Sequence, residues 1–124
     1  MLSRRSAAVL LFASIPAVAL ASAPERGPNG GWKVDAGPRH HVEVVFDGSP
    51  TINVFVSDGN SRAIPATGFS GTATVVVNGT THRVPLTAAE GSRLTGTAPV
   101  GVPAGTKGAV QLQLPGGGTV RAVL

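Results

Sequence analysis

The sequence predicts an all-β protein, a single antiparallel immunoglobulin-like β-sandwich of about seven strands that is preceded by a signal peptide. Short runs in which apolar and polar residues alternate recur from residue 40 onward. Asn78-Gly79, the strongest short-range hairpin signal, separates two of these runs. No apolar period of 3.6 residues, the mark of an amphipathic helix, occurs after residue 21.

The first 21 residues have the pattern of a signal peptide. Arg4 and Arg5 precede an apolar run over residues 7–20, and Ala19-Leu20-Ala21 fits the small-residue cleavage pattern. The run contains Pro16 and is shorter than the roughly 20 apolar residues that a spanning helix needs. We therefore expect a periplasmic or secreted protein with no stable membrane anchor after cleavage.

Charge and cysteine content exclude several classes of function. Residues 22–124 carry eight Lys or Arg and six Asp or Glu, a net charge of +2, and the basic residues are scattered. Without a basic cluster and with few aromatic residues, the chain is not expected to bind nucleic acid. It has no cysteine, which excludes disulfides, thiol catalysis and thiolate metal sites.

Residues 22–39 form a leader rich in Gly and Pro, and residues 40–124 form the predicted β-sandwich domain. The start of the leader is expected to be flexible, since such a composition buries little apolar surface to offset its ordering entropy. Trp32, the only tryptophan, is expected to dock on the edge of the sandwich and to order the rest of the leader.

Two hairpins follow. In residues 40–58, Val42, Val44 and Phe46 share one face of the first strand, Ile52, Val54 and Val56 share one face of the second strand, and residues 47–50 supply the turn. In the second, residues 72–77 and 80–86 flank Asn78-Gly79, and a two-residue loop opposes Val75 to His82 and Ala73 to Val84.

Three further main strands are expected at residues 93–98, 109–114 and 119–123, and the loop of residues 59–70 has room for a short strand at 62–64. In residues 109–114, Val110, Leu112 and Leu114 are expected to point inward, while Gln111 and Gln113 point outward.

The candidate metal ligands are His40, His41 and His82. Neighbouring residues of a strand point to opposite faces, so His40 and His41 cannot easily share one ion. Two interpretations stay open. In one, His40 and His41 cap a strand start and His82 lies on the rim of the sandwich. In the other, His40 or His41 and a carboxylate such as Glu43 or Asp35 form an open site that binds Cu(II) or Zn(II) weakly.

No catalytic constellation can be assembled, and the chain is not expected to be an enzyme. Gly68-Phe69-Ser70-Gly71 is one residue short of a nucleophile elbow and precedes a strand, where that motif needs a strand-to-helix turn. Gly116-Gly117-Gly118 lacks the Lys and the following helix of a phosphate loop.

Four segments together resemble a family of small exported proteins and N-terminal domains that accompany the periplasmic adaptor subunits of cobalt-zinc-cadmium or copper efflux systems. The segments are residues 27–31, 40–45, 54–58 and 93–96. The resemblance implies a periplasmic β-sandwich with an accessory role in metal handling. Of the three candidate metal ligands, only His40 and His41 match the family by position. His82 is a candidate because of the hairpin geometry alone. Asn29 stands where some relatives carry histidine.

Two functions follow as hypotheses. The first is an exported, non-catalytic accessory or binding module of heavy-metal efflux, with a periplasmic adaptor protein as partner and a weakly bound Cu or Zn ion. The alternative is a structural protein-protein interaction domain that pairs through an exposed sheet edge such as residues 119–124 and has no metal role.

Overall fold

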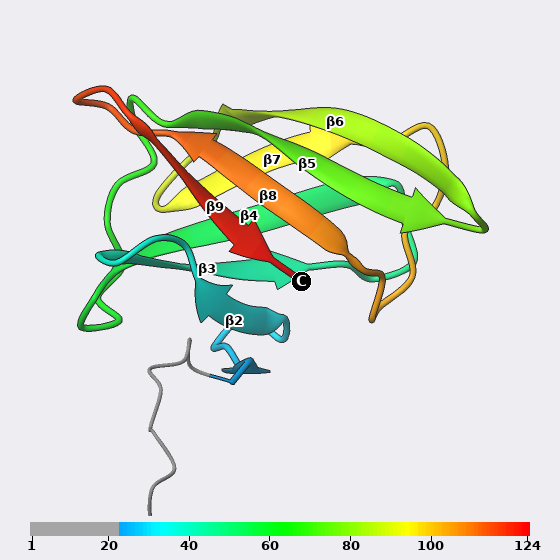
Figure 1. Cartoon of the computed structure of the whole chain (residues 1–124), viewed down its shortest axis with the longest axis horizontal. Coiled ribbons are helices and arrows are strands. Elements are labelled where there is room, and N and C mark those ends of the chain that lie inside the picture. The colour runs from blue at the N-terminus through cyan, green and yellow to red at the C-terminus, as the bar shows by residue number, and fades with distance from the viewer. Residues whose placement is uncertain (1–22) are drawn as a thin grey trace, which may run out of the picture.

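The computed structural model describes residues 23–124, which consist of strands, turns and loops (Figure 1). The all-β prediction is confirmed, because no helix occurs in this part of the chain. The predicted signal peptide, residues 1–21, lies outside the described residues.

The described residues contain nine strands. They are β1 (Glu25–Arg26), β2 (Trp32–Asp35), β3 (His40–Val45), β4 (Thr51–Asp58), β5 (Ser70–Val77), β6 (Thr80–Ala88), β7 (Arg93–Thr97), β8 (Gly108–Gln113) and β9 (Thr119–Val123). All pairings are antiparallel, and the order in the sheet is β1-β2-β3-β4-β7-β6-β5-β8-β9.

The predicted sandwich of two sheets is not what the structure has, because all nine strands belong to one hydrogen-bonded sheet. The sheet curls into a half-barrel (Figure 1), and β2 comes close to β9 without pairing with it. We call the gap between β2 and β9 the seam. Alternation reveals which side chains point inward, but it does not reveal whether they face a second sheet or the same sheet curled over.

The inner face of the half-barrel holds one apolar core. Its largest fully buried side chains are Ile52, Leu86, Leu94, Leu112, Val42, Val54, Val56, Val75, Val84, Val102 and Val110. In β8, Val110 and Leu112 are buried while Gln111 and Gln113 are exposed, as the alternation predicts. The absence of cysteine leaves this core to stabilise the fold.

Both predicted hairpins are confirmed. Val42 pairs with Val56 and Val44 with Val54, and all four side chains are buried. Phe46 lies just beyond the end of β3 and packs, partly buried, against the core. In the second hairpin Val75 pairs with His82, in the register that the two-residue loop requires.

Two strands lie in the Gly- and Pro-rich segment. β2 pairs with β3 along its whole length, and it contributes Val34 to the core. The predicted short strand at residues 62–64 is reduced to one isolated bridge between Ser57 and Ala63. Strands this short carry too few alternating residues to stand out in a sequence.

The β5-β6 turn should be sensitive to a side chain at its second position. Asn78 and Gly79 have φ angles of 52° and 77°, the left-handed conformation of a type I′ turn. Gly79→Val should therefore destabilise the protein by roughly 1–3 kcal/mol. Gly116→Val is the matched control, because Gly116 has no positive φ and open space around it. Chemical denaturation of both variants checks this, and equal midpoints would refute the assigned turn.

Candidate functional site

Glu43 is the one buried charged side chain of the described residues, with 3% of its surface exposed. It lies in β3 between two core valines, so it points to the outer face of the sheet. Its carboxylate accepts hydrogen bonds from the Asn29 amide nitrogen at 2.8 and 3.1 Å, the Asn29 side-chain Nδ2 at 2.8 Å and the Gly31 amide nitrogen at 2.7 Å. The buried charge is thus satisfied within the chain.

The loop from Gly27 to Gly31, which we call the carboxylate loop, is shaped to receive that group. The Gly27 amide donates to the Gly31 carbonyl at 3.0 Å, and the Gly30 amide donates to the Gly27 carbonyl at 3.3 Å. A Cβ on Gly27 would overlap the Glu43 carboxyl carbon, so only glycine lets the backbone approach so closely. The segment predicted to start as a flexible leader is therefore a turn that binds an internal carboxylate.

His41 lies beside Glu43 on the outer face and contacts acceptors with both ring nitrogens. Its Nε2 is 3.1 Å from Oδ1 of Asp35 on β2, and its Nδ1 is 3.0 Å from the Asp58 backbone oxygen. A carbonyl only accepts, so Nδ1 carries a proton. The lone pair of Nε2 would then face the Asp35 carboxylate, and such a contact is favourable only with a second proton or another cation between the two atoms. Metal-binding histidines commonly have their second nitrogen held in this way.

His40 and His82 lie apart from this pair. The His40 ring packs edge-on against Phe69 with centroids 6.1 Å apart, and its buried Nδ1 has no hydrogen-bond partner. His82 is on β6, which β4 and β7 separate from β3 in the sheet. Within residues 23–124, no three His, Cys, Asp or Glu side chains come together as metal ligands. Two carboxylates were expected as possible metal ligands. Asp35 contacts His41, whereas Glu43 is bound by the carboxylate loop.

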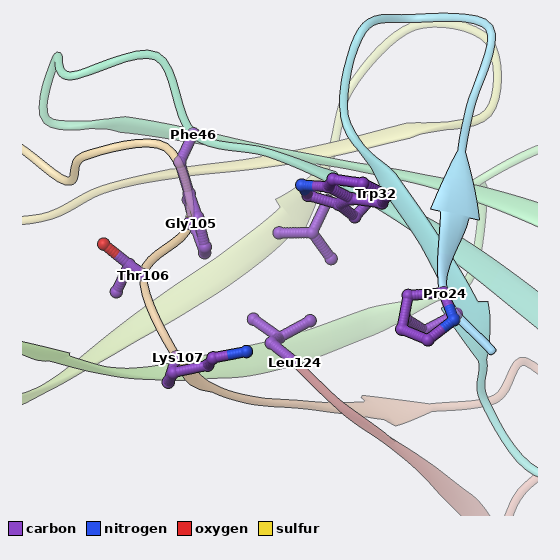
Figure 2. A pocket seen from close by; sticks show the side chains of 9 residues that line it. Pro24, Trp32, Phe46, Gly105, Thr106, Lys107 and Leu124 are labelled. Carbon is purple, nitrogen blue, oxygen red and sulfur yellow. The ribbon is translucent and has the colours of Figure 1, made fainter.

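A pocket of about 450 Å³ opens at one end of the seam (Figure 2). We call it the seam pocket; it is lined by Pro24, Trp32, Val34, Val44, Phe46, Gly105, Thr106, Lys107 and Leu124. Trp32 is 43% exposed, and the Arg26 guanidinium lies 4.5 Å from its ring centroid. The sequence predicted that Trp32 docks on the edge of the sandwich, whereas Trp32 is the first residue of β2 and pairs with both β1 and β3. The pocket itself could not be predicted, because its lining comes from five separate segments.

Comparison with known proteins found no match to a protein family, a curated protein or a solved structure. Residues 23–124 contain no helix able to cross a bilayer.

Removing the Glu43 carboxylate should destabilise the protein strongly. Glu43→Ala leaves the Asn29 and Gly31 amides without their acceptor and should cost about 3 kcal/mol or more. Glu25→Ala is the matched control, because its side chain is 67% exposed and should change stability by less than about 0.5 kcal/mol. Urea denaturation measures both, and similar losses for the two variants would contradict the assigned role.

Asp58 should titrate below the ordinary aspartate pKa. The Arg62 amide and then the Asn60 amide donate to its Oδ1 at 2.9 and 2.8 Å, and these bonds lower the pKa of Asp58 below 3.8. Their contribution to stability is present above pH 3.8 and is lost as pH falls through the lower folded-state pKa. Titration of the carboxyl carbon by NMR checks this, and a midpoint at or above 3.8 would contradict it.

Proposed function

We propose that this protein is an exported, non-catalytic interaction module that docks a partner polypeptide at the seam between β2 and β9. One observation carries the proposal: the sheet ends at β9, and no strand of the described residues pairs with its outer edge. Val123 on this strand is 67% exposed, although it is apolar. An uncovered edge of this kind can accept an extended segment of another chain.

The register of β9 identifies which groups are available. The Leu124 amide donates to the Gly108 carbonyl at 2.9 Å, so β9 bonds to β8 through residues 120, 122 and 124. The backbone N–H and C=O of Arg121 and Val123 therefore point away from β8, toward the seam.

Access to these groups differs along the seam. At one end it is closed, because a Cβ on Gly37 would lie only 2.8 Å from Cγ1 of Val120. At the other end Trp32 and Leu124 are far enough apart to line the seam pocket. A partner strand would therefore pair with the part of β9 nearest Leu124.

The export and the connection with heavy-metal efflux are also part of the proposal. Export is supported by the pattern of residues 1–21, and the connection with a periplasmic adaptor is supported by the four short segments described above. Docking through the seam is compatible with an adaptor as partner and does not require a metal ion.

A second candidate function is weak binding of a divalent ion by His41 and Asp35. The observation in its favour is the 3.1 Å between His41 Nε2 and Asp35 Oδ1. Two ligand atoms about 2.1 Å from one ion and at right angles to each other lie roughly 3 Å apart. The site would have only two side-chain ligands, so water would complete the coordination of Zn(II) or Cu(II).

Photo-crosslinking in the exporting host tests docking at the seam. A benzophenone amino acid replacing Arg121 should give a discrete adduct with a partner, whereas the same group replacing exposed Thr81 should not. Val123→Pro should abolish the Arg121 adduct because it removes an edge N–H without disturbing the β8 ladder, whereas Val123→Thr should retain the adduct. An adduct that survives Val123→Pro, or equal adducts at both positions, would refute the proposed edge.

Calorimetric titration with Zn(II) tests the second candidate. Heat of binding should disappear in His41→Ala, which removes one of the two ligand atoms, and fall sharply in Asp35→Asn, which replaces the anionic ligand with a neutral, weaker one. His40→Ala and His82→Ala are the matched controls and should bind as the unaltered protein does. Loss of the heat in His40→Ala, or its persistence in His41→Ala, would exclude the His41-Asp35 site.

A further inference from the structure

We propose that the seam pocket binds the anion of a medium-chain fatty acid, with the acyl chain against Trp32 and Phe46 and the carboxylate at the Lys107 ammonium group. This inference goes beyond partner docking, because it uses the interior of the pocket and not the backbone edge of β9, although both use the open end of the seam beside Leu124.

The pocket has the size for a small ligand. Its volume of about 450 Å³ falls in the range of roughly 300–1,000 Å³ that is usual for small-molecule sites. Its lining does not include Gly37 or Val120, where the two sides of the seam lie close together. A ligand in the pocket would therefore lie at the other end of the seam, beside Trp32 and Leu124.

The lining is suited to an acyl chain. Trp32, Phe46 and Leu124 line the pocket with large apolar side chains, and Val34 and Val44, only 7% and 3% exposed, also belong to the core. No Asp or Glu side chain lines the pocket. Because each methylene moved out of water should tighten binding about fourfold, affinity should rise steadily with chain length until the pocket is filled.

The single charged side chain of the lining determines which end group the ligand carries. Figure 2 shows the Lys107 amine turned toward Leu124, and both residues line the pocket. In the described part of the chain, no Asp or Glu carboxylate forms an ion pair with Lys107. A chain with an anionic head is therefore complementary to the pocket, whereas a cationic head would be repelled.

The only tryptophan of the chain lines the pocket and serves as the reporter. Sodium decanoate, kept below its micellar concentration, should change Trp32 fluorescence saturably, and octanoate should bind about 16-fold more weakly. Decanol should bind more weakly than decanoate, and decyltrimethylammonium more weakly still. Absence of a saturable change, or equal affinity for decanoate and decanol, would overturn the proposal.

Variants then locate the two ends of the ligand. Lys107→Met should weaken decanoate binding about fivefold and leave decanol binding unchanged. Lys33→Met is the matched control, because Lys33 is the only other lysine and contacts Glu25 and Ser61 on the outer face. Phe46→Ala should weaken both ligands, with an unfolding transition confirming that it remains folded. Equal decanoate affinity in the Lys107 and Lys33 variants would refute the anion site.

Discussion

The buried carboxylate of Glu43, enclosed by the carboxylate loop, is the interaction on which the rest of the structure depends. β2 has four residues and β1 has two, and neither buries enough apolar surface to be held by packing alone. The Asn29 and Gly31 amides fix the segment before β2 to the middle of β3. A carboxylate buried in this way favours one local arrangement, because any other that keeps it buried leaves it without hydrogen-bond donors.

Both candidate sites depend on this anchor, since β2 contributes to each. On the outer face it places Asp35 at 3.1 Å from His41, and on the inner face it places Trp32 and Val34 in the seam pocket. The same strand forms one side of the seam and so defines how much of the β9 edge a partner can reach. A chain in which β2 detached would keep the hairpins and their core, but it would lose the His41-Asp35 contact and the pocket together.

The sequence predicts features that are local. The β5-β6 hairpin is predicted to its register, because Asn78-Gly79 adopts two positive φ angles that few other dipeptides tolerate. The curl of the sheet and the seam depend on contacts between β2 and β9, far apart in the chain, so alternation suggested a sandwich instead. The carboxylate loop was not predicted, because its glycines suggested a segment that stays flexible to avoid the entropy cost of ordering. A charged Glu43 within an apolar strand, preceded by clustered glycines, was the available signal for it.

Amide hydrogen exchange in Glu43→Gln tests the central role of the carboxylate most directly. The substitution keeps the side-chain size but replaces an acceptor-only group with one that also donates. If Glu43 anchors β2, the amides of Gly31 and Val34 should lose protection, while those of Val75 and Val84 in the β5-β6 hairpin keep it. Unchanged protection at Gly31 and Val34, or an equal loss throughout the sheet, would contradict the account.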